Sequence, residues 1–226
     1  MKTKFRHYPS KPKAKAVINA YIILCNTHDA ASSFLDIFES TRKSRKAKGA
    51  STNEEQDLLR AMLVFATSGL DSVVKQLIQD ALSLVIKKDE GSLRVFKNYV
   101  ENKIIKSGQI NAKLLAMALG SENPREELMQ ELVRDLTSNS LQSKDELLKV
   151  ASYFNIPSAQ LTNDFTLLER IFIVRNQIIH EMDIDFHQAK RNRRPRGYPE
   201  MIKFTNEILR LALVFLNVVD GKLTSS

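Results

Sequence analysis

Apolar residues recur every three or four positions along most of this chain, and no segment alternates convincingly with a period of two. A spacing of three and four residues marks one face of an α-helix. It predicts a first helix over about 14–40 and a long second helix over about 53–87. The second helix has a broad apolar stripe, which is typical of a central helix. The chain is therefore expected to be all-α.

Capping residues predict where several helices begin. Thr52 with Glu55 forms the pattern of a capping box, and Pro124 after Asn123 suits the first position of a helix. The remaining helices are predicted at about 92–107, 111–119, from 124 onward, 143–155, 163–183 and 199–219.

No linker is long enough to force a division, so residues 1–226 are predicted to form a single domain. It would begin with a basic tail over 1–13. The short helices of 91–157 are a candidate inserted subdomain between the long helices.

The positive charge of the chain gathers in patches. Lys and Arg number 34 against 26 Asp and Glu. Three stretches without any acidic residue, 1–15, 42–48 and 190–196, hold much of the excess, and the rest of the chain has more acids than cations. The stretch 42–50 breaks the helical pattern and is predicted to be a loop. Patches favour a local site for a polyanion over a uniformly basic surface.

Several classes of protein are disfavoured by composition and motifs. Cys25 is the one cysteine, so an intrachain disulfide is impossible and a reducing compartment is expected. No glycine-rich phosphate loop and no nucleophile elbow occurs. No signal-peptide pattern and no uninterrupted apolar span of membrane length is present. We expect a cytoplasmic protein that does not enter a membrane.

A charged residue, Arg175, interrupts the apolar stripe of the helix predicted over 163–183. The positions three and four residues away, its neighbours on a helix, are Ile171, Phe172, Ile178 and Ile179. A guanidinium in such a place requires an anion, an opposing polar network or a wet interface. Two interpretations stay open. Arg175 binds a phosphate through its planar fork, or it reaches solvent or pairs with a core carboxylate such as Asp71.

His180 follows Arg175 by five residues. At about 100° and 1.5 Å per residue, their side chains diverge by about 140° and about 7.5 Å along the helix. They do not share one face as an i, i+4 pair would, although both can line a groove at the edge of the helix. The helical neighbours of His180 are mostly polar, which suits a wet site.

Residues 175–180, Arg-Asn-Gln-Ile-Ile-His, resemble the R-x4-6-H motif of the HEPN superfamily, in which a polar residue such as Asn176 commonly follows the arginine. The second helix, with Ala-Thr-Ser-Gly-Leu-Asp-Ser-Val-Val at 66–74, resembles that of the RiboL-PSP-HEPN group. The resemblance covers the long helices and is weaker over 91–157. It implies an all-α, HEPN-like bundle of long helices with an inserted group of short ones.

Many HEPN proteins are metal-independent endoribonucleases, often toxins or phage-defence effectors, and they generally act as dimers with the two motifs facing each other. The resemblance implies that His180 is the general acid or base when a ribose 2′-OH attacks the adjacent phosphorus. It implies that Arg175 holds the scissile phosphate and that Asn176 orients one of these groups. The partner is then RNA, because the reaction needs a 2′-OH.

The same resemblance implies a homodimer with a composite active site, no cofactor, and an antitoxin or defence-system protein as a candidate partner. In some antitoxin-regulated members a tyrosine two residues after the histidine is modified by a partner nucleotidyltransferase. Met182 stands at that position here. Control by nucleotide transfer to this residue is therefore not expected.

The basic turn after the motif is predicted to guide RNA to the cleft. Its cations are Lys190, Arg191, Arg193, Arg194 and Arg196. Tyr198 is a candidate for stacking on a base. Asp71, or Thr67 and Ser68, is a candidate supporting group from the second helix. The alternative is a solvated basic loop without a partner.

Two further functions remain open. If the helix continued, His180, Asp183 or Ile184, and His187 would share a face, and two histidines with a carboxylate could bind a divalent metal, as in a metal-dependent nuclease. The chain could also be a HEPN module that binds RNA or a protein partner without catalysis.

Overall fold

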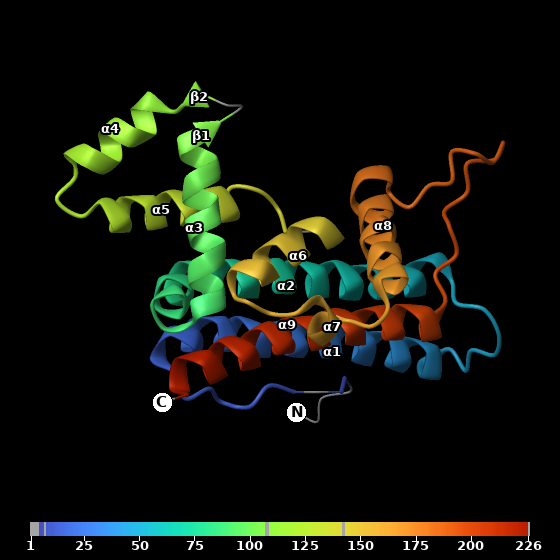
Figure 1. Cartoon of the computed structure of the whole chain (residues 1–226). Coiled ribbons are helices and arrows are strands. Elements are labelled where there is room, and N and C mark those ends of the chain that lie inside the picture. The colour runs from blue at the N-terminus through green and yellow to red at the C-terminus, as the bar shows by residue number, and fades with distance from the viewer. Residues whose placement is uncertain (1–4, 7, 107–108, 142, 226) are drawn as a thin grey trace.

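The computed structural model describes residues 5–6, 8–106, 109–141 and 143–225, and they form a helical structure. Three long helices lie lengthwise together: α1 (Ile18–Ser44), α2 (Asn53–Lys88) and α9 (Tyr198–Thr224) (Figure 1). A fourth, α8 (Phe165–Glu181), stands steeply against α2 and α9. The predicted all-α class is confirmed.

Shorter elements complete the chain. A 3-10 turn, η1 (Lys15–Val17), precedes α1. Between α2 and α8 come α3 (Glu90–Ile104), the paired strands β1 (Ile105–Lys106) and β2 (Gln109–Ile110), α4 (Ala112–Gly120), α5 (Pro124–Thr137), α6 (Lys144–Tyr153) and α7 (Ser158–Leu161). The two-residue antiparallel strands and α7 were not predicted from the sequence, because such short segments carry too few residues to show a period.

The predicted capping box at the start of α2 is present. The Glu55 backbone N–H donates to the Thr52 hydroxyl at 3.3 Å, and the Thr52 N–H donates to the Glu55 carboxylate at 2.9 Å. That carboxylate is buried and also accepts from Arg42 and Arg45 at the end of α1. These contacts explain why α1 continues to Ser44, although the basic residues were predicted to form a loop from residue 42.

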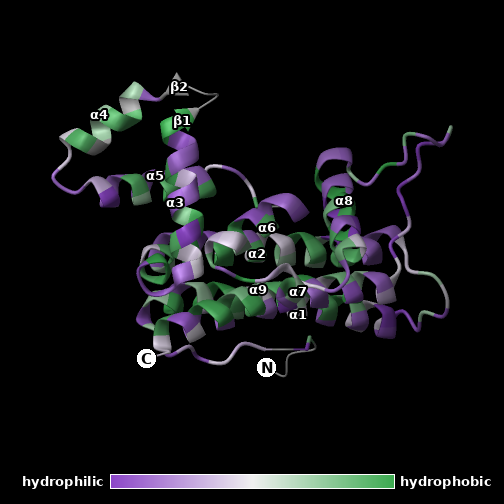
Figure 2. Ribbon diagram, in the orientation of Figure 1, coloured by the Kyte–Doolittle hydropathy of each residue, from purple (hydrophilic) through white to green (hydrophobic). Residues whose placement is uncertain are grey.

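Residues from α2 are buried along nearly the whole helix, from Leu59 to Ile86. The same core includes Phe96 of α3, Leu132 of α5 and Leu147 of α6. Figure 2 shows apolar residues along α2 and α9, which pack against each other. Part of the inserted segment therefore shares the core of the long helices, while α3 carries β1, β2 and α4 away from it (Figure 1).

The start of the chain is anchored along α9. Phe5 is buried, and the Arg6 N–H donates to Asn206 at 3.1 Å. The N–H groups of Lys13 and Ala14 donate to the Asp220 carboxylate at 3.0 and 2.7 Å. The described part of the predicted basic tail is therefore attached to the bundle rather than free. Residues 1–4 and 7 of that tail lie outside the described residues.

By length and composition alone, α2 is apolar enough to cross a membrane. In the structure, 56% of its most apolar window is buried inside the protein. This is the burial expected of the central helix of a bundle, which passes the same compositional test.

A close approach of α1 and α2 occurs at Gly69. A Cβ there would lie 2.2 Å from Thr27 Cγ2 and 2.8 Å from Thr27 Cβ.

Gly69→Ala is therefore expected to lower the free energy of unfolding by about 2 kcal/mol, because the helices must separate. Urea denaturation measures this. Gly221→Ala in α9 is the control: nothing lies within 4 Å of its Cβ, so it should stabilise the helix by about 0.5–1 kcal/mol. Equal effects at the two glycines would contradict the close packing.

Candidate active site

Helix α8 carries the Arg175–His180 motif and has defined ends. The Asp164 carboxylate accepts the Leu167 N–H at 2.8 Å, which caps the first turn. At the other end, Met182 and Asp183 adopt left-handed conformations, with φ of 51° and 60°. Both of their N–H groups donate to the carbonyl of Gln177. This termination fixes the last helical turn, which bears His180.

The Arg175 side chain is half-buried, and its Nε is buried without a hydrogen-bond partner among the described residues. Its Nη1 donates to the Asn176 side chain at 2.9 Å. Burial lowers the pKa of Arg175, and the negative charge of Asp71 opposes that shift. Loss of hydration with few compensating hydrogen bonds leaves this guanidinium able to bind an anion.

The helical neighbours of Arg175 are not all buried as the sequence suggested. Ile171 and Phe172 are buried, Ile178 is half-buried, and Ile179 is exposed. The apolar stripe thus covers one side of Arg175 and leaves the other side open.

Asp71 does not form an ion pair with Arg175 within the part of the chain that the structure describes. Its carboxylate accepts the Leu141 N–H at 2.7 Å and pairs with Lys75 at 3.1 Å. Of the two other residues considered for the cleft, Ser68 is exposed, whereas Thr67 is buried and donates to the Leu63 carbonyl. The prediction that Thr67 lines a cleft is wrong. Asp71 therefore influences Arg175 through the electrostatic attraction of its negative charge, without a direct contact.

His180 and Asn176 lie on the exposed side of α8. No hydrogen bond joins His180 to Arg175 among the contacts of the described residues, as their divergence around the helix predicts. The side chains of Arg175 and His180 therefore leave α8 in different directions within one chain.

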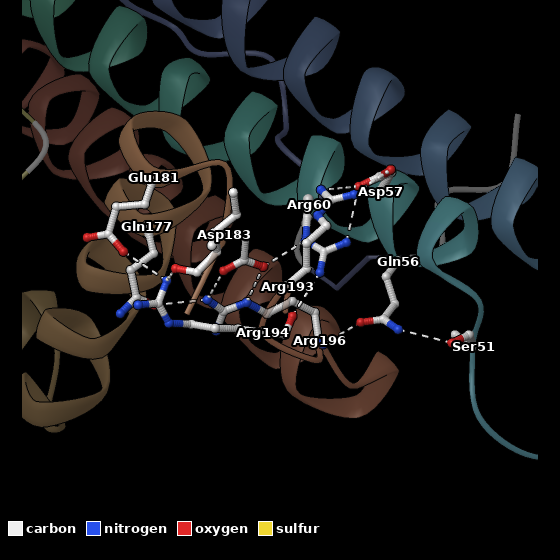
Figure 3. A network of polar contacts seen from close by, with 11 residues as sticks. Ser51, Gln56, Asp57, Arg60, Gln177, Glu181, Asp183, Arg193, Arg194 and Arg196 are labelled. Carbon is white, nitrogen blue, oxygen red and sulfur yellow. Dashed lines mark hydrogen bonds and ion pairs between the residues drawn. The ribbon is translucent and has the colours of Figure 1, made fainter. Parts of the chain in front are cut away.

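A buried ionic cluster lies directly after the motif (Figure 3). The Asp183 carboxylate is fully buried and accepts from Arg60 Nε at 2.7 Å and from Arg196 Nε at 2.9 Å. Arg196 also donates to the Gln177 side chain at 2.9 Å. We call Arg60, Gln177, Asp183 and Arg196 the Asp183 cluster. It joins α2, the last turn of α8 and the segment before α9.

The basic turn is used largely within the molecule. Arg193 donates to Asp57 at 3.0 Å, and Arg194 donates to Glu181 at 2.8 Å. Arg196 is buried in the Asp183 cluster, so the prediction that it contacts RNA is wrong: two bonds to Asp183 and one to Gln177 occupy its guanidinium. The sequence could not show these acids beside the turn, because Asp57 lies on another helix.

Lys190 and Arg191 remain exposed. They lie on the loop that projects away from the helices between α8 and α9 (Figure 1). Of the five cations predicted to guide RNA, these two are the ones whose side chains face solvent most freely.

A scan of family models matches residues 29–219 to RiboL-PSP-HEPN. The chain belongs to this family. No curated protein and no solved structure shows significant similarity to it. The match includes the Arg175–His180 motif and extends through the inserted segment. HEPN domains are generally ribonucleases, so membership supports a nuclease or an RNA-binding module.

The alternative metal site of this HEPN protein is contradicted by the geometry. Helix α8 ends at Glu181, so His180, Asp183 and His187 do not share a helical face. The Asp183 oxygens are already bound by arginines in a fully buried position. No group of three or more His, Cys, Asp or Glu able to hold a metal ion occurs in the described ranges.

Arg60 is the site residue that the sequence reasoning missed. It interrupts the apolar stripe of α2 and is buried, with 3% of its surface exposed. The signal that drew attention to Arg175 is incomplete here, because the positions three and four residues before Arg60 are Asp57 and Gln56, and only Leu63 and Val64 on the other side are apolar. Its partner lies 123 positions away, so periodicity alone could not identify it.

Asp183→Asn in this HEPN protein should lower the free energy of unfolding by about 3 kcal/mol, because two buried arginines lose their counter-charge. Asp57→Asn is the matched control at the edge of the same network, where the carboxylate is half exposed. It should cost less than about 1 kcal/mol. Chemical denaturation of both variants measures the difference. A loss at Asp183 no larger than at Asp57 would show that the cluster does not hold the end of α8.

Proposed function

We propose that this HEPN protein is a metal-independent endoribonuclease whose active site contains Arg175, Asn176 and His180. The observation that carries the proposal is the half-buried Arg175 guanidinium with its unpartnered Nε, on the same helix as an exposed histidine. A partly dehydrated guanidinium binds a phosphate strongly. The histidine is accessible for proton transfer near neutral pH.

In the proposed reaction, the ribose 2′-oxygen attacks the adjacent phosphorus and the bond to the 5′-oxygen breaks. A His180 side chain accepts the 2′-OH proton, and a protonated histidine supplies a proton to the leaving 5′-oxygen. Arg175 stabilises the negative charge on the non-bridging oxygens. Asn176, bonded to Arg175, holds the guanidinium in orientation. The products are a 2′,3′-cyclic phosphate and a free 5′-OH.

The proposal includes a homodimer in which two copies of α8 face each other. The exposed side of α8 contains Ile173 and Ile179 on either side of Asn176, and Met182 follows at the helix end. Their exposed fractions are 50%, 37% and 66%. A partner copy would cover these apolar groups and bring a second motif opposite the first. This arrangement supplies the second histidine that acid–base catalysis requires.

We further propose that the protein acts on RNA in the cytoplasm as a toxin or phage-defence effector, held in check by an antitoxin or a defence-system partner. The proposal rests on its HEPN family membership. Its test is expression: toxicity to cells that is relieved by His180→Ala supports the role.

His180→Ala and Arg175→Ala should each reduce cleavage of a single-stranded RNA by about 10²-fold or more, because each removes a group that acts on the reacting atoms. Wild-type cleavage should persist in excess EDTA. Gel analysis of end-labelled RNA, with detection of the cyclic phosphate, measures both effects.

Matched controls are available on the same part of the chain. His187→Ala removes an exposed histidine, and Arg170→Ala removes an exposed arginine that pairs with Glu200. Both should retain near-wild-type cleavage. If wild type and His180→Ala are equally inactive while still binding RNA, the protein is a non-catalytic RNA-binding module.

Ile173→Asp should weaken the dimer, because it places a charge on the apolar face of α8 where a partner copy is proposed to pack. Sedimentation equilibrium measures the association, and RNA cleavage should fall with it. Ile22→Asp, on the exposed side of α1, is the control and should change neither. A monomeric wild-type protein that cleaves RNA would contradict the composite site.

A further inference from the structure

An open hollow lies where the end of α1, the loop before α2 and the segment leading into α9 meet. Its volume is about 660 Å³, within the range of about 300–1,000 Å³ typical of small-ligand sites. Phe38, Arg42, Ala50 and Tyr198 are among the residues that line it. The function proposed above does not use this hollow.

The aromatic side of the hollow is held in a fixed orientation. Tyr198 stacks on Phe38 with ring centroids 5.3 Å apart and planes at 17°. Its hydroxyl donates to Glu39 at 3.1 Å. Tyr198 remains 37% exposed. An exposed ring whose rotamer is already restrained loses little entropy when a planar ligand stacks on it.

Arg42 lines the hollow, and Lys46 and Lys48 come just before the lining residues Gly49 and Ala50 in the chain. Arg42 and Arg45 are paired with the buried Glu55, whereas Lys43, Lys46 and Lys48 are exposed. A planar aromatic surface with exposed lysines on the adjoining loop suits a ligand with a base and a phosphodiester, because stacking and charge act on its two parts. Single-stranded nucleic acid has this chemistry.

Arg196 connects the hollow to the candidate active site. Its backbone N–H donates to Gln56 at 2.6 Å on the side of the hollow. Its guanidinium reaches Gln177 at 2.9 Å, one helical turn before His180. Arg196 therefore lines the hollow and also contacts the last turn of α8; Figure 3 shows it between Gln56 and Gln177.

We propose that this hollow binds one base of the single-stranded RNA substrate by stacking on Tyr198, with the flanking phosphates on Lys46 and Lys48 of the adjoining loop. The inference rests on the proposed ribonuclease function and deepens it, because it names a substrate subsite. A base within a duplex cannot enter, so the site selects unpaired RNA.

The test measures binding separately from cleavage. In the full-length His180→Ala protein, fluorescence anisotropy gives the dissociation constant of a short unstructured RNA. Tyr198→Ala should weaken binding about tenfold, and Tyr198→Phe, which keeps the ring, should restore it to within about twofold. Ala50→Trp should weaken binding similarly by filling the hollow without removing a native contact. Replacing Lys48 by Gln should lower the salt dependence of binding by about one phosphate contact.

Tyr8→Ala is the matched control, because Tyr8 is also an exposed tyrosine but packs against His28, away from the hollow. It should leave RNA binding unchanged. If Tyr198→Ala and Ala50→Trp unfold at the wild-type temperature and bind RNA with unchanged dissociation constants, the base-binding proposal is wrong. The ribonuclease proposal is not affected by that result, because wild-type cleavage tests it separately. If wild type does not cleave RNA but binding depends on Tyr198, the catalytic proposal fails and the base site stands.

Discussion

The Asp183 carboxylate accepts hydrogen bonds from Arg60 and Arg196 at a position from which solvent is excluded. A buried charge is tolerated only when its partners are in place, so three distant segments must meet for this group to be accommodated. They are α2, the end of α8 and the segment before α9. This requirement sets where α8 stops, and hence where His180 stands. Because Arg196 lies two residues before Tyr198, the same requirement also sets where α9 begins and where Tyr198 lies.

The arginines of this HEPN protein divide by what neutralises them. Arg60 and Arg196 are committed to Asp183, and Arg193 is committed to Asp57, which it holds at a pKa below the usual value. Arg175 is half-buried and has no carboxylate partner among the described residues. A guanidinium in the first group stabilises the fold, whereas Arg175 retains the capacity to bind a phosphate. The net charge of +8 therefore overstates the number of cations available to bind a polyanion.

The helices and their starts could be predicted from local signals. The Thr52–Glu55 capping box, Asp164 at the start of α8 and the apolar period of α2 all depend on residues within a few positions of one another. Arg175 could likewise be singled out from local sequence, because its neighbours three and four positions away are apolar. Predictions that required knowledge of a distant partner were less successful. The basic turn was predicted to face RNA, but Asp57, Glu181 and Asp183 each pair with one of its arginines.

The sequence by itself determined the all-α class, the principal helices and the position of the HEPN motif, because periodicity, capping and motif spacing are encoded over short stretches of chain. Only the tertiary structure decided which charged groups are neutralised, that Asp183 ends α8 rather than binding a metal, and that Phe38 and Tyr198 form one wall of a hollow. These features join residues more than a hundred positions apart. Their distances depend on the packing of α1, α2, α8 and α9, which no local pattern specifies.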